Sequence, residues 1–205
     1  AVRARFPDAL ISIDTYKADI AAAALDAGAD MINDISALRM DRNMARTAAD
    51  AGCPVCLMHM QGEPRNMQKD PRYDKDPVGE IIAFLEERIA AAVESGIQER
   101  NIIIDPGIGF GKTAEHNLEI MNRLDEFRVL GRPVLLGASR KRFIGAALNQ
   151  PDEADRLHGS LAVAALAAAR GADIVRVHDV PETANAVRMA DAICRKTRSA
   201  RGRGA

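Results

Sequence analysis

An aspartate and a series of glycines stand together in residues 102–113, IIIDPGIGFGKT, the part of the chain best suited to bind a ligand. The apolar, β-branched run Ile102–Ile104 predicts a buried strand that ends at Asp105. Pro106 stops strand pairing, and Gly107 begins a series of three alternating glycines that lets the backbone approach a ligand closely. Because a carboxylate delivered by an apolar strand is costly unless it is satisfied, we interpret the segment as a binding site rather than a simple turn.

Two familiar phosphate-binding loops do not fit the spacing of these glycines. A Walker loop needs four residues between its first glycine and the Gly-Lys pair, but only three separate Gly107 from Gly111. A dinucleotide fingerprint would need a glycine where the chain has Lys112. The loop therefore predicts a different ligand.

Short apolar strands alternate with longer amphipathic stretches along the chain, which is the pattern of βαβ units around a parallel sheet. Strands are expected at Leu10–Asp14, Met31–Asp34, Val55–His59, Ile102–Asp105, Val134–Gly137 and Ile174–His178. Helices are expected at Lys17–Ala27, Asn43–Ala51, Pro77–Ser95, Glu115–Asp125, Leu157–Arg170 and Glu182–Thr197. The polar segment 59–77 between two of them predicts a loop that covers or borders a site.

Side chains that can bind a ligand stand at the ends of all six expected strands, where ligands of parallel α/β barrels bind. Acceptors on Asp14, Asn33 and Asp105 suit a flat ring edge that carries amino and ring N–H donors. Lys141 can donate to a ring carbonyl or ring nitrogen. Asp14 alone could simply cap the following helix, but six such strand ends together favour a site.

The last expected strand carries two groups suited to an anion. Arg176 can stack on a ring while its guanidinium reaches an anion. His178 and the amides that begin the last helix can hold phosphate oxygens, although a lone histidine is more often a core residue. The two side chains share one face of the strand and can point together toward the strand ends.

Composition limits the classes of protein that fit. The 205 residues carry a formal net charge of −1, which argues against nucleic acid or an anionic membrane as a partner. No apolar run approaches a membrane span and the N-terminus lacks a signal sequence, so we expect a cytoplasmic protein. Cys53 and Cys56 would face opposite ways on a strand and are interpreted as ordinary thiols.

Six collinear motifs resemble the signatures of bacterial dihydropteroate synthases. They are SIDTYK at Ser12–Lys17, INDISA at Ile32–Ala37, LMHMQGEPRNMQ at Leu57–Gln68, DPGIGFGK at Asp105–Lys112, SRKRFIG at Ser139–Gly145 and RVHD at Arg176–Asp179. The resemblance implies a (β/α)8 TIM-type barrel, truncated here to about the last six βα units. We expect a barrel domain over residues 1–197 and a basic tail over 198–205.

The resemblance also implies what the chain lacks. Members of that family begin with a strand that carries a metal-binding Asn and a second strand followed by a Ser/Thr-Arg-Pro-Gly loop, neither of which matches this sequence. A complete barrel of this type needs about 250 residues. We therefore expect the isolated chain to be unstable and essentially unable to turn over.

The implied reaction condenses 6-hydroxymethyl-7,8-dihydropterin diphosphate with p-aminobenzoate, which gives 7,8-dihydropteroate and diphosphate. Lys141, Arg176 and His178 would be catalytic, and the last two would hold the diphosphate. The pterin would be bound by Asp14, Asn33, Met58, Asp105, Gly137, Lys141 and Arg176. The p-aminobenzoate would be bordered by Phe110, Ser139 and Lys141. Mg²⁺ would assist, with its ligand in the missing region and none assigned here, and the family implies a homodimer.

Two alternatives remain open. A methyltetrahydrofolate:corrinoid methyltransferase could share the recognition of the pterin edge by a carboxylate and Asn33, but it would not need Lys141 or the pair Arg176 and His178. A non-catalytic pterin-binding fragment would keep the pterin residues without the reaction.

Overall fold

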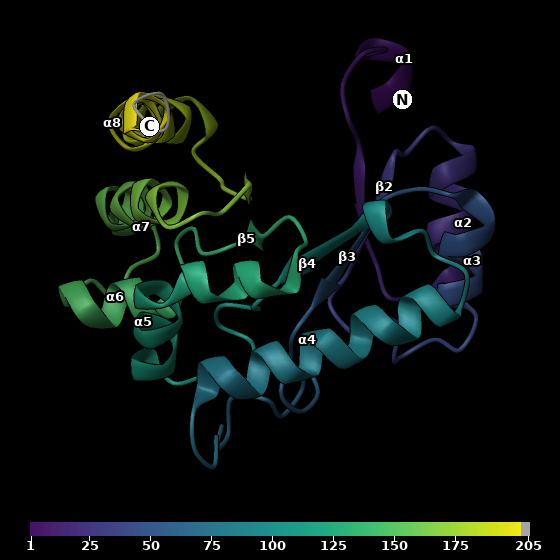
Figure 1. Cartoon of the computed structure of the whole chain (residues 1–205), viewed down its shortest axis with the longest axis horizontal. Coiled ribbons are helices and arrows are strands. Elements are labelled where there is room, and N and C mark those ends of the chain that lie inside the picture. The colour runs from purple at the N-terminus through teal and green to yellow at the C-terminus, as the bar shows by residue number, and fades with distance from the viewer. Residues whose placement is uncertain (202–205) are drawn as a thin grey trace. The chain divides into compact units, whose positions relative to one another are not determined.

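The computed structural model describes the backbone of residues 1–201 and the side chains of residues 1–194 (Figure 1). The strands are β1 (Ser12–Asp14), β2 (Met31–Asp34), β3 (Val55–Met58), β4 (Ile102–Asp105), β5 (Leu135–Leu136) and β6 (Ile174–Val175). The α-helices are α1 (Val2–Arg5), α2 (Ala18–Asp26), α3 (Met44–Ala51), α4 (Pro77–Glu94), α5 (Ala114–Asn122), α6 (Arg142–Leu148), α7 (Leu157–Ala169) and α8 (Val180–Arg201). Three short 3-10 helices are η1 (Glu99–Asn101), η2 (Leu124–Leu130) and η3 (Ala154–Arg156). Each strand is followed by a helix, which confirms the predicted α/β class with six βα units.

The chain forms two compact units, each with its own sheet. The first unit consists of Ala1–Met60, Gly79–Gly107 and Leu130–Pro133. The second unit consists of Gln61–Val78, Ile108–Val129 and Val134–Ala205. The expectation of one barrel domain over residues 1–197 stays a prediction.

The first unit is built on a parallel sheet in the order β1-β2-β3-β4. One face of this sheet, which includes Ile32, Val55, Leu57 and Ile102, packs against α2, α3 and α4 in a buried apolar core. The short side chains of the alanine-rich helices allow close packing, and Ala21 is completely buried. Because side chains alternate along a strand, the residues between these core positions point to the opposite face.

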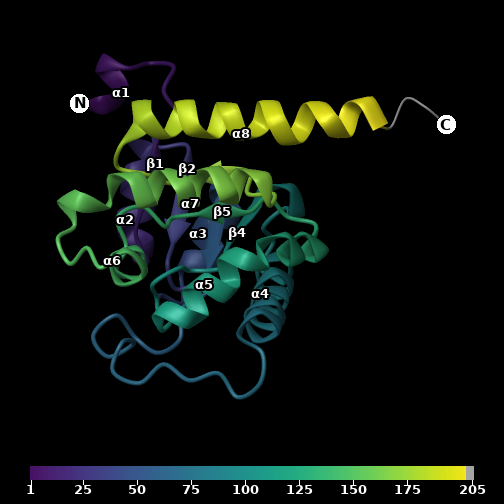
Figure 2. The same cartoon turned by 90° about the vertical axis from the view of Figure 1, so that its left-hand side faces the viewer.

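The second unit holds a two-stranded parallel sheet, β5-β6, and the α-helices α5, α6, α7 and α8. Figure 2 shows α8 running alongside α7, in agreement with Figure 1. Thr113 begins α5 with a capping box in which its side chain and that of His116 satisfy each other's backbone amides. Helix α6 ends at Asn149 in a left-handed conformation.

The expected boundaries differ from the structure mainly in the second unit. The predicted strands Val134–Gly137 and Ile174–His178 shorten to two residues each, so Gly137 and Arg176 lie in the segments after the strands. Helix α6 was not predicted because seven residues are too few to establish a helical period.

The C-terminal helix continues further than predicted, to Arg201. The side chains of the expected tail 198–205, and its backbone from residue 202, lie outside the described residues. Among the described residues, no helix is both long enough and apolar enough to cross a membrane.

Candidate functional site

Four residues predicted to bind a ligand lie on one face of the four-stranded sheet, at its carboxyl end. The strand register pairs Asp14 with Asn33 and Met58 with Asp105. Asn33 also pairs with Cys56, which shares its face of β3 with Met58 because the two are separated by one residue. This face is opposite the helix-covered face, so the sheet presents Asp14, Asn33, Met58 and Asp105 together.

The Asp105 carboxylate is fixed by its own turn and is only 6% exposed. Its Oδ1 accepts a hydrogen bond from the Gly107 amide at 2.7 Å, and its backbone carbonyl accepts one from the His59 amide at 2.9 Å. Asp14, in contrast, is exposed at the edge strand β1. The structure therefore gives the Asp105 carboxylate a fixed, buried position at the carboxyl end of β4.

The pKa of the buried Cys56 thiol is affected by carboxylates near it. Burial, followed by the carboxylates of Asp105, Asp14 and Asp34, raises the pKa of the Cys56 thiol well above its usual range. Cys56 is a protonated, buried side chain, and Cys53 and Cys56 are both free thiols, as predicted. Of these carboxylates, Asp14 and Asp105 lie on the same face as Asn33 and favour a ligand that presents N–H donors.

Asn33 supplies a buried acceptor on the same face. Its side chain is 8% exposed, and its Oδ1 atom has no hydrogen-bond partner among the described residues. A buried carbonyl oxygen without a donor is costly, so such groups call for an explanation in the function of the site. A ligand with an N–H group would satisfy it.

Asp34, the next residue, serves the fold. Its completely buried carboxylate accepts hydrogen bonds from the Ser36 amide and hydroxyl, each at 2.7 Å, and from the Leu38 amide at 2.9 Å. These bonds hold a turn in which Ala37 and Leu38 both have positive φ angles. Burial raises the pKa of Asp34. The sequence alone does not distinguish this structural role from that of Asn33.

Two glycines of the loop, Gly107 and Gly111, lie against neighbouring backbone. A β-carbon at Gly107 would lie 1.8 Å from the carbonyl oxygen of His59, and one at Gly111 would lie 2.4 Å from that of Gln61. Both glycines have positive φ angles, 70° and 64°. Neighbouring backbone therefore requires glycine at both positions, and the expectation that the loop approaches a ligand closely stays a prediction.

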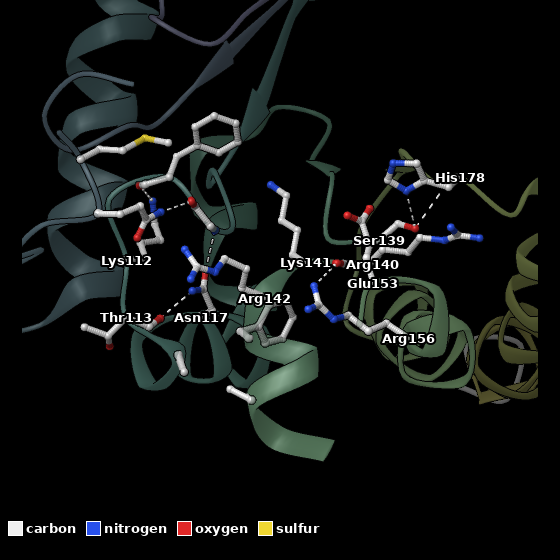
Figure 3. Close-up of a pocket in the computed structure, with 17 residues that line it drawn as sticks. Lys112, Thr113, Asn117, Ser139, Arg140, Lys141, Arg142, Glu153, Arg156 and His178 are labelled. Carbon is white, nitrogen blue, oxygen red and sulfur yellow. Dashed lines mark hydrogen bonds between the residues drawn. The ribbon is translucent and has the colours of Figure 1, made fainter. Parts of the chain in front are cut away.

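The second unit contains a cavity of about 610 Å³ at the starts of α5 and α6. Figure 3 shows Lys141 between the side chains of Thr113 and Asn117 on one side and those of Ser139 and His178 on the other. Its charged lining side chains are Lys112, Arg140, Lys141, Arg142 and Arg156, which are cationic, and Glu153, which is acidic. This excess of cations suits a ligand with an anionic group.

Lys141 and Phe110 form one wall of this cavity. The Lys141 Nζ lies 4.5 Å from the centroid of the Phe110 ring and donates a hydrogen bond to the carbonyl oxygen of Ile108. The contact with the ring face is a cation–π interaction. The structure thus brings the predicted residues Lys141 and Phe110 into contact. The Lys141 amine is bound to the backbone of the glycine loop at Ile108.

Ser139 and His178 form a second predicted pair. The Ser139 Oγ accepts a hydrogen bond from the His178 amide at 3.3 Å and lies 3.0 Å from His178 Nδ1. Ser139 is buried and His178 is exposed, and both line the cavity. The serine hydroxyl is therefore engaged with the histidine.

Gly137 and Arg176 are placed differently. The backbone amide of Arg176 donates to the Leu136 carbonyl at 2.9 Å, and its side chain is exposed. Neither residue is among those that line the described cavity. Their predicted roles at the pterin stay predictions.

The segment predicted to cover or border a site lies at the rim of this cavity. Met67 and Gln68 line it, and the Gln68 side chain donates to the Gly109 carbonyl oxygen. The Tyr73 hydroxyl donates to the Gly111 carbonyl at 3.1 Å. Arg123 forms ion pairs with Asp76 at 2.6 Å, which attaches the end of the segment.

Sequence reasoning missed the residues that support the cavity. Asn117 accepts a hydrogen bond from the Gly109 amide at 2.7 Å and donates one to the Thr113 carbonyl at 2.6 Å. Arg156 is buried and donates to the carbonyl oxygens of Gln150, Arg140 and Pro151. The available sequence signal was the position of Asn117, four residues after Thr113, where the glycine loop ends. A polar residue at that helical position can reach back to the loop.

Comparison with known proteins shows that this chain is similar to members of one enzyme family. The family described as "Pterin binding enzyme" matches residues 1–178. A dihydropteroate synthase from a Synechocystis species is 46% identical over 188 residues, which cover 92% of this chain and 65% of that protein. The chain therefore spans slightly less than two thirds of that relative's length.

Solved structures show the same likeness. The Yersinia pestis dihydropteroate synthase, solved as a sulfonamide drug complex, is 43% identical with a TM-score of 0.90, covering 97% of this chain and 70% of that one. The Xanthomonas albilineans dihydropteroate synthase in complex with 7,8-dihydropteroate is 43% identical with a TM-score of 0.83, covering 90% of this chain and 66% of that one. These structural neighbours are TIM barrels, which confirms the predicted fold class.

Proposed function

Because the chain belongs to the pterin binding enzyme family, we propose that it serves the dihydropteroate synthase reaction. In this reaction 6-hydroxymethyl-7,8-dihydropterin diphosphate and p-aminobenzoate give 7,8-dihydropteroate and diphosphate. The observation that carries the proposal is the buried Asn33 Oδ1, which lacks a donor among the described residues and lies on the sheet face that also presents Asp105. A pterin edge supplies N–H donors for such a group.

The proposed pterin contacts follow from the acceptors on this face. Asp105 would accept from the ring N–H and amino groups, where charge-assisted bonds add both strength and orientation. Asn33 would add one more acceptor, Asp14 would contribute at the edge strand, and Met58 would pack beside the ring. The predicted roles of Gly137, Lys141 and Arg176 at the pterin come from the resemblance and stay predictions.

The cavity of the second unit supports the proposed p-aminobenzoate site. Phe110 offers an aromatic face, and Lys141 lies over it. The cationic lining suits a benzoate carboxylate. Ser139 would border this site mainly through the histidine that it contacts.

The proposed catalysis is electrostatic. Departure of diphosphate would leave positive charge on the pterin, and cations placed to hold the departing anion would stabilise this separation of charge. Arg176 and His178 are assigned to the diphosphate, and Lys141 to both substrates. No side chain is required as a covalent nucleophile.

The assistance of Mg²⁺ in the reaction remains a prediction. The side chains of residues 1–194 contain no group of three or more His, Cys, Asp or Glu residues that could hold a metal ion. No metal ligand is therefore assigned among the described residues, and no step of the proposal passes through a metal.

A homodimer belongs to the proposal as well. Exposed apolar side chains on the last two helices, Leu166 at 54%, Met189 at 61% and Ile193 at 57%, support an interface there. Sedimentation of the chain at two concentrations tests this assignment, and a monomer at both would contradict it.

Calorimetric titration tests the proposed function against its alternative. We expect the chain to bind 7,8-dihydropteroate and inorganic diphosphate but not methyltetrahydrofolate. Binding of the methylated folate without binding of diphosphate would favour a corrinoid methyltransferase. Binding of a pterin without diphosphate or p-aminobenzoate would favour a non-catalytic pterin-binding fragment.

A further inference from the structure

Arg140 has a backbone conformation that requires support. Its φ angle is +57°, in the left-handed region that residues with a β-carbon rarely adopt. Its amide donates to the Ser160 Oγ at 2.8 Å. Its carbonyl oxygen accepts from Arg156 Nη1 at 2.9 Å, as Figure 3 shows. The surrounding structure therefore fixes the backbone at this residue.

The side chain of Arg140 binds one carboxylate through two nitrogen atoms. Its Nε lies 3.0 Å from Asp179 Oδ2, and its Nη2 lies 2.5 Å from Asp179 Oδ1. The two side chains are 30% and 17% exposed. Two parallel bonds between a guanidinium and a carboxylate fix the orientation of both groups.

This ion pair connects the two segments that carry the cavity residues. Arg140 lies between Ser139 and Lys141 after β5, and Asp179 directly follows His178 after β6. The contact between Ser139 Oγ and His178 Nδ1 lies beside it, one residue earlier in each segment. A shift at the pair would therefore move both the lysine and the histidine.

We propose that Arg140 and Asp179 are positioning residues, which hold His178 against Ser139 and keep Lys141 at the cavity. The hydrogen bond from Arg140 lowers the pKa of Asp179, so the pair is charged at neutral pH. The consequence for ligand binding rests on the proposed function, whereas the placement of His178 does not.

A double-mutant cycle on the full chain separates positioning from direct contact with the ligand. Arg140→Gly removes the side chain without leaving a β-carbon in the left-handed region, and Asp179→Asn keeps the size of the side chain while it removes the charge. We expect each change to weaken calorimetric binding of inorganic diphosphate by about tenfold to a hundredfold, as misplaced binding groups do. The double variant should bind no more weakly than either single variant, because both disrupt the same pair.

Two further variants serve as references. Arg140→Lys keeps the positive charge but loses the two guanidinium nitrogens that bind Asp179. This variant should therefore bind inorganic diphosphate as weakly as Arg140→Gly does. Arg132→Ala breaks an ion pair with Glu99 in the first unit, where the arginine is 19% exposed, and should leave binding unchanged. Additive losses in the cycle would overturn the proposal, since they would mean that Arg140 contacts the diphosphate itself.

A ligand-free measurement tests the placement of His178 directly. The chain has four histidines, so the side-chain ¹⁵N signals of His178 can be assigned by their loss in His178→Gln. We expect Arg140→Lys to shift the His178 Nδ1 signal and Arg132→Ala to leave it unchanged. An unshifted signal in Arg140→Lys would overturn the inference even if diphosphate binds. Failure of the unaltered chain to bind diphosphate would instead contradict the proposed function.

Discussion

The carbonyl oxygen of His59 lies 1.8 Å from the place that a β-carbon at Gly107 would occupy. This approach brings the end of β3 against the turn that follows β4, where the Gly107 amide also binds Asp105. The site aspartate is therefore held by a turn that only glycine can form.

Gly107→Ala should destabilise the chain strongly. The positive φ angle of 70° and the backbone overlap together should lower the free energy of unfolding by about 3 kcal/mol or more. Gly52→Ala is the matched control, because Gly52 has a φ angle of 61° but no atom within 4 Å of the added carbon, and it should cost only about 1 kcal/mol. Urea unfolding measures both, and equal losses would show that the overlap is relieved by a small shift.

Asn33→Leu should separate stability from binding. The replacement removes a buried acceptor that lacks a donor among the described residues, so the free energy of unfolding should rise by about 1 kcal/mol. Pterin affinity should fall by about tenfold because one hydrogen bond is lost. Asn117→Leu, at a buried asparagine whose amide groups are both bonded, should instead destabilise the chain. A destabilised Asn33→Leu variant would mean that the Asn33 amide supports the fold.

The stability of the chain should decrease in acid. The Ile11 amide and Arg3 lower the pKa of Asp30, and Arg140 lowers that of Asp179. A carboxyl whose pKa is lower in the folded state contributes stability that is fully present above its unfolded pKa and is lost as the pH falls below about 4. Thermal unfolding between pH 7 and pH 3 measures this loss, which should be smaller in Asp30→Asn. An identical slope in that variant would contradict the assignment to Asp30.

Lys141→Ala and Arg176→Ala should impair different ligands. Lys141 lies over Phe110 in the cavity, so its loss should weaken binding of p-aminobenzoate. Because Lys141 is also predicted to contact the pterin, its loss should weaken pterin binding as well. Arg176 should matter more for the diphosphate group. Titration with the pterin and with its diphosphate compares the two variants, and equal effects of Arg176→Ala on both ligands would mean that it only stacks on the ring.

The sequence predicted the first unit better than the second. The apolar runs of β2 and β4 were located at their observed bounds, because a buried β-branched strand has a clear pattern. The same apolar runs placed Asp14, Asn33 and Asp105 at or next to strand ends. The two-residue strands β5 and β6 carry too little pattern to set their limits.

Other features depend on contacts between residues far apart in the chain. The bonds of Arg156 to three backbone carbonyls, and the ion pair between Arg140 and Asp179, are invisible to local propensity. The alternating glycines signalled a close approach, but only the structure identifies the His59 and Gln61 carbonyls as the groups approached.

Titration of Asp105→Asn and Asp14→Asn with a pterin tests the central claim most directly. An asparagine at position 105 can still accept from the Gly107 amide, so the turn should persist while the charge is lost. Because Asp105 is fixed and buried whereas Asp14 is exposed, Asp105→Asn should weaken pterin binding by about tenfold to a hundredfold, and Asp14→Asn by less. Unchanged affinity in Asp105→Asn, measured on a variant that unfolds like the unaltered chain, would remove Asp105 from the site and contradict the account of pterin recognition.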